Sequence, residues 1–230
     1  MGRVCVVIPA AGEGTRMGGL PKQFNTLGDS PLLYQTAWAF ECHNRVDDIV
    51  VAAPADTTAH ARHLMSGISK LVRVVAGGAT RQESVAAGLA AAPRDSVIVL
   101  VHDAARPFIE AAAITEVIAA VVLHGAAALA VPVADTVRYA EGGFFTGEAS
   151  RRNLFAVQTP QGFRRSLLAE AFESCVPDGA ATDEVALVRA CGHAVARVPG
   201  RAGNFKITTG EDWHRAERRW PAFARRNYES

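Results

Sequence analysis

The chain has 230 residues, enough to bury a substantial hydrophobic core. Hydrophobic residues make up 49% and charged residues 20%, which excludes intrinsic disorder and fibrous repeats. The formal net charge is +1, so no global basic field favours binding to nucleic acid or to an anionic membrane surface. The most apolar stretch, 111–133, is interrupted by Thr115, Glu116 and His124 and is not expected to span a membrane.

The cysteine spacing and the N-terminal residues predict a cytoplasmic location. Four cysteines are widely spaced and form no Cys-x-x-Cys pair: Cys5, Cys42, Cys175 and Cys191. This spacing predicts buried thiols in a reducing compartment, with neither a disulfide framework nor a zinc site. Residues 1–3 lead directly into an apolar segment that is too short for a signal peptide. We therefore expect a soluble, cytoplasmic protein.

Short apolar runs alternate with longer helical patterns as far as residue 133. Helices are expected at 31–40, 55–66, 83–92 and 111–123, and the first has Asp29-Ser30 as its cap and Pro31 in its first turn. Apolar strands that alternate with helices indicate a parallel sheet covered on both faces. The predicted fold class is therefore α/β with a mostly parallel sheet, whose strands are expected at 4–9, 48–53, 71–76, 96–102 and 126–133.

The alternation breaks at about 135–158. Residues 136–139 alternate in polarity at period two, Gly142-Gly143 is a turn signal, and 154–157 is typical of a second strand. These features predict a β-hairpin that projects from the sheet as an arm. A lone two-stranded hairpin is only marginally stable in water, so we expect the arm to pack against the same hairpin of a second subunit.

The last third of the chain returns to the earlier pattern. Helices are expected at 163–174, 183–191 and 210–219, and a strand at 194–198. No internal repeat interrupts the chain. Residues 1–230 are therefore expected to form a single domain with one dimerisation arm.

A glycine-rich segment, 10–19, follows the first strand, where α/β sheets bind nucleotides. A dinucleotide fingerprint is excluded because Met17 occupies its third glycine position, and a P-loop is excluded because the chain has no Gly-Lys-Ser or Gly-Lys-Thr. The segment matches the nucleotidyltransferase loop, in which Gly-x-Gly-Thr-Arg-Met is followed by Pro-Lys. A plain structural turn is the alternative. Arg16 and Lys22 favour the loop, because two cations suit a reaction that builds charge on a triphosphate.

A second motif, His102-Asp103-Ala104-Ala105-Arg106-Pro107, follows the fourth strand at the same edge of the sheet. There the Asp103 carboxylate is able to hold a Mg²⁺ ion that phosphate oxygens also bind. The alternatives are a turn cap for Asp103 and a surface ion pair for Arg106. We expect His102 to belong to the buried end of the strand and to have no catalytic role.

These motifs together resemble the 2-C-methyl-D-erythritol 4-phosphate cytidylyltransferase family. The resemblance extends from about Arg3 to about Trp213, and its motifs keep the family's order and spacing. Beyond the two motifs above, it depends on Gly77-Gly78 with Ser84, Asp135-Thr136, Gln158-Thr159-Pro160-Gln161, Thr182-Asp183-Glu184 and Asn204-Phe205-Lys206-Ile207-Thr208. One departure is Phe155, at a position that is commonly Trp in the family. The resemblance implies a Rossmann-like nucleotidyltransferase sheet with helices on both faces.

The resemblance also implies roles for individual residues. The catalytic cations would be Arg16, Lys22, Arg151 and Lys206. The nucleotide would be bound by Ala10, Ala11, Gly12, Gly14, Gly77, Gly78, Ser84 and Ala104. The acceptor would be bound by Asp103, Arg106, Thr136, Thr159 and Thr182, and Asp103 would also hold the metal.

The implied partners are CTP, 2-C-methyl-D-erythritol 4-phosphate, Mg²⁺ or another divalent cation, and a second copy of the chain. The arm would exchange across a homodimer, so that Arg151 and Thr159 of one subunit complete the site of the other. Neither nucleic acid nor a membrane is expected as a partner.

The implied reaction is attack of the acceptor's phosphate oxygen on the α-phosphorus of CTP, with loss of pyrophosphate. A phosphate monoester is already anionic, so positioning and electrostatics are sufficient without a strong general base. A cytidylyltransferase for ribitol 5-phosphate or a related polyol phosphate is an alternative enzyme. A nucleotide-binding module without turnover is disfavoured, because it has little use for groups that bind only developing charge. A Rossmann oxidoreductase is disfavoured by Met17.

Overall fold

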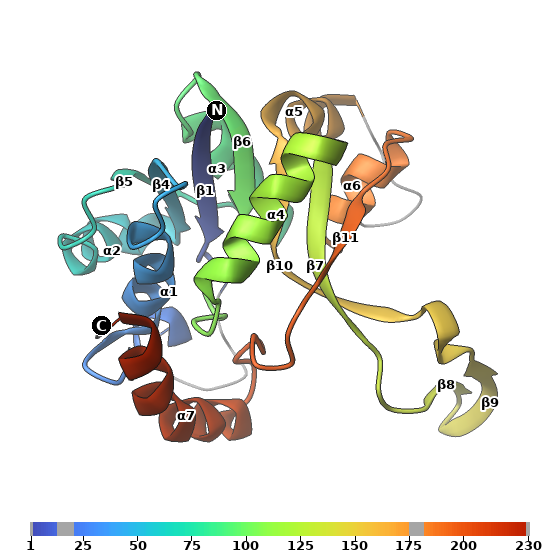
Figure 1. The fold of residues 1–230 in the computed structure, drawn as a ribbon. Coiled ribbons are helices and arrows are strands. Elements are labelled where there is room, and N and C mark those ends of the chain that lie inside the picture. The colour runs from blue at the N-terminus through green and yellow to red at the C-terminus, as the bar shows by residue number, and fades with distance from the viewer. Residues whose placement is uncertain (1, 13–20, 175–181, 229–230) are drawn as a thin grey trace.

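A computed structural model describes residues 2–12, 21–174 and 182–228. Within them, the core is a seven-stranded sheet in the order β11-β7-β10-β6-β1-β4-β5 (Figure 1). Four neighbouring pairs are parallel, and only β10 runs antiparallel, between β6 and β7. The fold is therefore mostly parallel α/β, as predicted. The strands of this sheet are β1 (Arg3–Pro9), β4 (Asp48–Ala53), β5 (Leu71–Ala76), β6 (Ser96–Val101), β7 (Ala126–Pro132), β10 (Phe155–Arg164) and β11 (Ala196–Pro199).

Helices cover both faces of the sheet, because successive strand residues point to opposite sides. In β1, Val6 and Ile8 face a core shared with α1, α2 and α4, whereas Cys5 and Val7 face a core shared with α3, α5 and α6. Helix α7 forms a third, smaller cluster around Phe108. The helices are α1 (Leu32–Glu41), α2 (Thr58–Leu64), α3 (Arg81–Ala91), α4 (Ala111–His124), α5 (Arg165–Ser174), α6 (Glu184–Ala190) and α7 (Gly210–Tyr228). The short elements are the 3₁₀ turns η2 (Lys22–Phe24), η3 (Ala55–Thr57) and η4 (Arg151–Asn153) and the strand pair β2 (Thr26–Leu27) and β3 (Ser30–Pro31).

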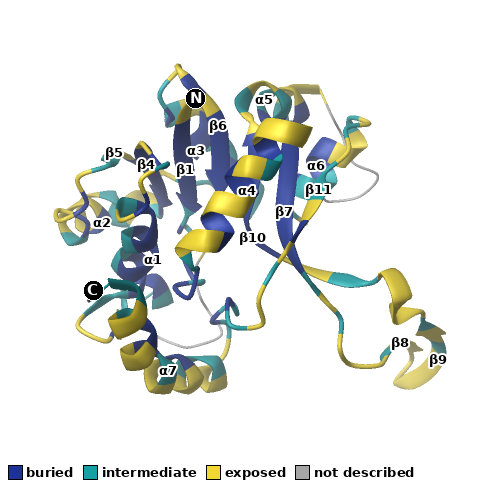
Figure 2. Ribbon diagram, viewed as in Figure 1, coloured by how far each residue is buried: buried dark blue, intermediate teal, exposed yellow. Residues whose placement is uncertain are grey.

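The arm consists of β8 (Val137–Glu141) and β9 (Phe144–Ala149), which pair antiparallel and extend away from the sheet (Figure 1). Gly142 and Gly143 join them with φ angles of 56° and 85°, a left-handed conformation that favours glycine. Most of the arm is exposed (Figure 2). The prediction that residues 154–157 form its second strand is wrong, because β10 contains residues 155–157 and pairs them with β7 in the main sheet.

Three predicted helix boundaries are corrected where tertiary contacts outweigh local signals. Ser30 pairs in β3 and Pro31 precedes α1, while the Asp29 carboxylate accepts a hydrogen bond from Gln35 Nε2 at 3.2 Å. Strand β10 continues to Arg164, so α5 begins after it. Helix α7 continues nine residues beyond its predicted end at Arg219, to Tyr228, because Trp220 and Phe223 are buried against the core.

The expectation for the cysteines is confirmed at one position only. Cys5 is a buried free thiol, but Cys42 is an exposed free thiol and Cys191 is disulfide-bonded. Cys175 lies outside the described residues. Among the described helices, none is both long and apolar enough to cross a membrane.

Candidate active site

The predicted binding segments meet at the carboxyl edge of the parallel strands. Backbone hydrogen bonds extend the sheet into each segment: Ala10 N–H donates to Ala52 at 2.7 Å, Gly77 N–H to Ala53 at 2.8 Å, and His102 N–H to Val7 at 3.0 Å. These bonds hold the ends of β1, β5 and β6 in register. The sheet thus places residues 10–12 and the Gly77-Gly78 turn at the same edge as Asp103, as the sequence predicted.

The Gly77-Gly78 turn is packed too tightly for side chains. A Cβ atom on Gly77 would lie 2.5 Å from the Cβ of Ala11, and one on Gly78 would lie 2.2 Å from the Cβ of Glu83. Ser84 is buried and forms hydrogen bonds with this turn. Its Oγ accepts a hydrogen bond from Gly78 N–H at 3.2 Å and donates one to the Thr80 carbonyl at 2.9 Å. Ser84 therefore shapes the predicted nucleotide-binding turn from beneath.

Lys22 lies beside a segment that is distant in sequence. Its Nζ donates to the carbonyl of Ile207 at 2.7 Å, and the neighbouring Gln23 donates to the carbonyl of Ala10 at 2.6 Å. These contacts join η2 to the end of β1 and to the segment that contains Lys206. Gly12 is described and has open space around it, whereas Gly14 and Arg16 lie outside the described residues.

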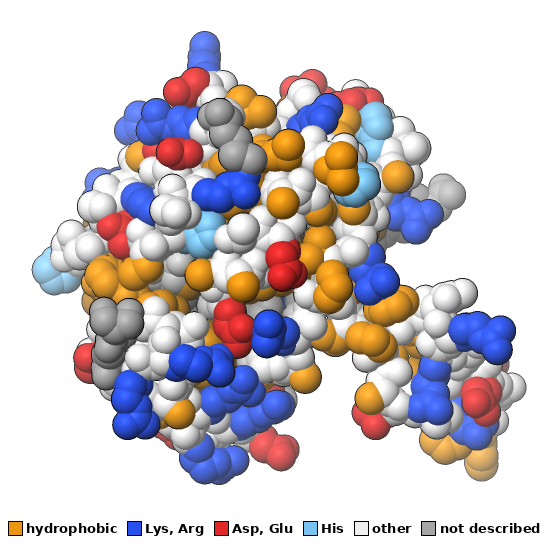
Figure 3. Space-filling view, in the orientation of Figure 1, with side chains coloured by type: hydrophobic (Ala, Val, Ile, Leu, Met, Phe, Trp, Pro, Cys, Tyr) orange, Lys and Arg blue, Asp and Glu red, His pale blue; other side chains and the backbone are white. Residues whose placement is uncertain are grey.

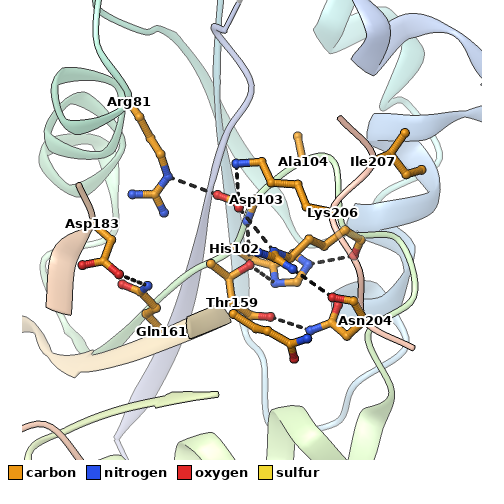
Figure 4. A network of polar contacts seen from close by, with 12 residues as sticks. Arg81, His102, Asp103, Ala104, Thr159, Gln161, Asp183, Asn204, Lys206 and Ile207 are labelled. Carbon is orange, nitrogen blue, oxygen red and sulfur yellow. Dashed lines mark hydrogen bonds and ion pairs between the residues drawn. The ribbon is translucent and has the colours of Figure 1, made fainter. Parts of the chain in front are cut away.

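Asp103 is the centre of a charged cluster and is only 7% exposed (Figure 4). Its Oδ1 accepts from Arg81 Nε at 3.1 Å, and its Oδ2 lies 3.0 Å from Lys206 Nζ and 3.4 Å from Arg106 Nε. Burial by itself would raise the pKa of the Asp103 carboxyl, but these three positive charges outweigh burial and hold the pKa well below its usual range. Asp103 is therefore a fixed negative charge at neutral pH.

His102 lies beneath Asp103, and both of its ring nitrogens form hydrogen bonds. Its Nε2 is 3.0 Å from the Arg106 carbonyl and must donate to it, which leaves Nδ1 to accept from Thr159 Oγ1 at 3.1 Å. Thr159 Oγ1 in turn accepts from Asp103 N–H at 3.0 Å. Complete burial lowers the pKa of His102 to about 4, so the ring is neutral. The structure confirms that His102 belongs to the buried end of the strand.

The position of Thr159 corrects one expectation. The resemblance places Thr159 in the site of a second subunit, but its side chain is 3% exposed and bonded to His102 and Asp103 of its own chain. Its carbonyl also accepts from Asn204 Nδ2 at 2.8 Å. Thr159 therefore supports Asp103 from beneath and is not part of the arm.

Sequence reasoning missed Arg81 and gave no role to Glu184. Arg81 Nη1 lies 2.8 Å from both carboxylate oxygens of Glu184, whose side chain is fully buried. The only signal was a motif that ends in Glu at the start of a predicted helix, where an acidic residue is usually explained by the helix dipole. Only the tertiary structure, which brings the start of α3 next to the start of α6, shows that its partner is Arg81.

The remaining predicted residues lie around this cluster or on the arm. Ala104 is buried, and its carbonyl accepts from Thr36 Oγ1 at 2.8 Å. Thr182 is exposed two residues before the start of α6. Thr136 and Arg151 are exposed at the base of the arm, where Arg151 Nη1 donates to the carbonyl of Ala134. Within one chain, the hydrogen bonds of the described residues do not connect Thr136 or Arg151 to Asp103.

The described residues do not form a self-contained metal site. They include no group of three or more His, Cys, Asp or Glu side chains placed to hold an ion. Asp103 is a single ionised carboxylate at the rim, which suits the way Mg²⁺ is often bound, through one carboxylate together with substrate phosphates.

Solved structures with the same fold identify the class of protein. A 4-diphosphocytidyl-2C-methyl-D-erythritol synthase from Anaerococcus prevotii matches with a TM-score of 0.83 at 26% identity, over 96% of this chain and 99% of that one. The 2-C-methyl-D-erythritol 4-phosphate cytidylyltransferase of Thermus thermophilus matches with a TM-score of 0.75 at 37% identity, over 94% and 98%. The fold and the site define a Rossmann-like α/β nucleotidyltransferase.

The sequence comparisons identify the family. The model of the 2-C-methyl-D-erythritol 4-phosphate cytidylyltransferase family matches residues 4–219. A relative of that name from Salinibacter ruber is 49% identical over 223 residues, which are 96% of this chain and 94% of that protein. The chain therefore belongs to this family, and the resemblance is confirmed. It is also 44% identical to a bifunctional enzyme IspD/IspF from Anaeromyxobacter dehalogenans, of which it covers 56%.

Proposed function

We propose that this chain transfers CMP from CTP to 2-C-methyl-D-erythritol 4-phosphate and releases pyrophosphate. The product is 4-diphosphocytidyl-2-C-methyl-D-erythritol. One observation carries the assignment of roles: the Lys22 ammonium bonds the carbonyl of Ile207, and the adjacent Lys206 ammonium lies 3.0 Å from Asp103. Lys22, the cation expected at the nucleotide, therefore contacts the residue next to Lys206, the cation expected at the acceptor.

The reaction needs an anionic nucleophile and a stabilised leaving group. A phosphate oxygen of the acceptor attacks the α-phosphorus in line, a new P–O bond forms, and the bond to the pyrophosphate oxygen breaks. Lys22, with Arg16, offsets the charge that develops on the phosphates. His102 takes no proton, because burial lowers its pKa to about 4 and its accepting nitrogen, Nδ1, is already bonded to Thr159.

The acceptor side of the site is assigned to the Asp103 cluster. The Asp103 carboxylate would accept hydrogen bonds from the acceptor's hydroxyls, and Lys206 and Arg106 would bind its phosphate. Lys206 is suited to this role, because its side chain is 39% exposed while its ammonium contacts Asp103. Thr182, two residues before α6, would contact the same substrate.

The divalent cation is expected to arrive with the triphosphate. Asp103 would supply its protein ligand, and the ion would offset negative charge on the phosphates. Nucleotide contacts are assigned to the backbone of residues 10–12 and of Gly77-Gly78, and among these positions Gly12 has open space around it.

A homodimer is proposed from the exposed arm. Phe144 and Phe145 are 78% and 79% exposed at its turn, and the hydrophobic side chains at the far end of the arm are visible in Figure 3. Pairing with a second arm would bury this surface and bring Arg151 to the acceptor phosphate of the other subunit. The cytoplasmic location inferred from the sequence remains a prediction.

The acceptor is tested by measuring pyrophosphate release from CTP with different polyol phosphates. We expect turnover with 2-C-methyl-D-erythritol 4-phosphate and little with ribitol 5-phosphate. Faster turnover with ribitol 5-phosphate would establish the alternative enzyme. CTP binding with no pyrophosphate release from either acceptor would indicate a binding module.

A further inference from the structure

The Arg81–Glu184 ion pair joins the starts of α3 and α6 next to Asp103. Arg81 is the first residue of α3, shortly after the Gly77-Gly78 turn, and Glu184 is the first residue of α6, two positions after Thr182. Arg81 Nη1 lies 2.8 Å from both oxygens of Glu184, while its Nε donates to Asp103 at 3.1 Å. One guanidinium therefore bridges two carboxylates in different elements.

Stability alone is a weak explanation for this pair. The Glu184 side chain is fully buried and that of Arg81 is 26% exposed, so both groups lose hydration on folding. Replacing a buried ion pair by well-packed apolar side chains of similar volume is often neutral or stabilising, whereas removing one partner is strongly destabilising. A buried pair beside a functional carboxylate is better explained by the geometry that it imposes.

The start of α6 is also fixed from its other side. The Asp183 carboxylate accepts from Gln161 Nε2 of β10 at 3.0 Å and caps the helix by accepting from Ala186 N–H at 2.9 Å (Figure 4). Asp183 and Glu184 are thus both anchored, one to β10 and the other to α3. Thr182 precedes these two anchored residues directly, so their placement determines where Thr182 lies relative to Asp103.

We propose that Arg81 and Glu184 are positioning residues that couple the nucleotide side of the site to its acceptor side. Arg81 orients the Asp103 carboxylate and, through Glu184, fixes Thr182 relative to the Gly77-Gly78 turn. This inference rests on the proposed function, because it concerns productive placement of the acceptor. It predicts that losing the pair weakens acceptor binding and turnover while CTP binding persists.

The decisive variant replaces both charges at once, as Arg81→Met with Glu184→Leu. The single variants leave a buried charge unpaired and are expected to lower Tm, but the double variant removes both charges and should recover Tm. We expect it to keep the Kd for CTP within about twofold while kcat/KM for the acceptor falls ~10- to 100-fold, as for residues that orient groups contacting a ligand. Arg81→Lys keeps the positive charge but lacks the planar guanidinium. Its KM for the acceptor should lie between the KM of the wild type and that of the double variant.

The matched control is the ion pair between Arg3 and Asp48, at the opposite edge of the sheet. Arg3 Nη2 donates to Asp48 at 2.7 Å, and the Asp48 side chain is only 1% exposed, so this pair also contains a buried carboxylate. The double variant Arg3→Met with Asp48→Leu should leave kcat and KM at wild-type values.

The outcomes separate this inference from the function itself. Absence of pyrophosphate release by the wild-type enzyme would refute the proposed function. Wild-type turnover together with unchanged kcat and KM in the Arg81→Met/Glu184→Leu variant would overturn the positioning role. A parallel loss of CTP affinity and acceptor turnover would also overturn it, because the effect would then not be specific to the acceptor side.

Discussion

The Asp103 cluster and the β8–β9 arm hold their polar groups in opposite ways. In the cluster, the carboxylate is 7% exposed and contacts three cations from α3, from its own loop and from the 204–208 segment. On the arm, Arg151 is exposed and donates a hydrogen bond to a backbone carbonyl at the base of the same arm. The cluster is organised within one chain. In the proposed homodimer, the functional neighbours of the arm would come from the second subunit.

Under that proposal, the single fold completes the Asp103 cluster, whereas the groups on the arm would act only after two chains assemble. Buried charges demand partners, so the side chains around Asp103 are mutually fixed in the single chain. A two-stranded hairpin has no core of its own, so the arm contributes little to the stability of the domain. Variants in the two regions should therefore fail in different ways.

The largest expected effect is on catalysis at the rim. Lys22→Ala should lower kcat by about a hundred- to a thousandfold, since losing one donor to developing charge costs ~2.7–4 kcal/mol. CTP affinity, measured by calorimetry, should change much less. Lys70→Ala is the control, because Lys70 also donates to backbone carbonyls but lies away from the site. Near-normal kcat in Lys22→Ala would remove this residue from the mechanism.

The next largest effect is on the pH dependence of stability and concerns His102, which is buried beneath Asp103. His102 has a pKa of about 4 in the fold against an ordinary 6.5, so below pH 6.5 the unfolded chain binds a proton that the folded chain does not. Its contribution to stability is therefore lost as pH falls from 6.5 toward 4, by about 3 kcal/mol in total. As pH falls from 6.5 to 4, the unfolding free energy of the His102→Gln variant should therefore decrease by less than that of the wild type. Equal slopes for both proteins would show that His102 is not buried in neutral form.

Subunit mixing tests whether the arm completes a second site. Lys22→Ala and Arg151→Ala chains should each be inactive alone, and after exchange a mixed dimer contains one site with both lesions and one with neither. Activity should return to about a quarter of wild type at equal mixing, because half of the dimers are mixed. If exchange is verified and no activity returns, Arg151 acts within its own chain.

The smallest expected effect is on the stability of the isolated chain. Phe144→Glu combined with Phe145→Glu should change the unfolding free energy of the monomer by no more than about 0.5 kcal/mol, because exposed side chains contribute little. The same variant should lower dimer affinity, as measured by sedimentation. A large loss of monomer stability would show that the arm packs on its own domain.

Much of the site could be predicted from the sequence because its residues follow predicted strands. Gly77-Gly78 and Asp103 come directly after β5 and β6, and parallel strands bring such positions to one edge. Lys22 and Lys206 were selected from motifs. Their proximity was not predictable from spacing, because it requires Ile207 to contact a residue 185 positions earlier.

Local signals misassign residues 154–157 and hide the role of Glu184 for the same physical reason. Local pattern assigns residues 154–157 to the arm, because it cannot distinguish a hairpin strand from the start of a central antiparallel strand. The resemblance, not the pattern, places the nearby Thr159 in a partner's site. Cross-strand pairing with β7 decides between the two strand assignments. Likewise, Glu184 at a helix start suits the helix dipole, and only the tertiary structure reveals its pairing with Arg81 at the start of α3.

The sequence by itself determined the alternation of apolar strands with helices, the glycine turns at strand ends and the types of charged residue that follow them. These are local properties, set by side-chain periodicity and by the conformational freedom of glycine. The tertiary structure alone decided which charges meet, which threonine lies beneath Asp103 and which strand pairs antiparallel in the sheet. Such outcomes depend on burial and on contacts between distant segments, because a buried charge or backbone group accepts only a geometry in which a partner is present.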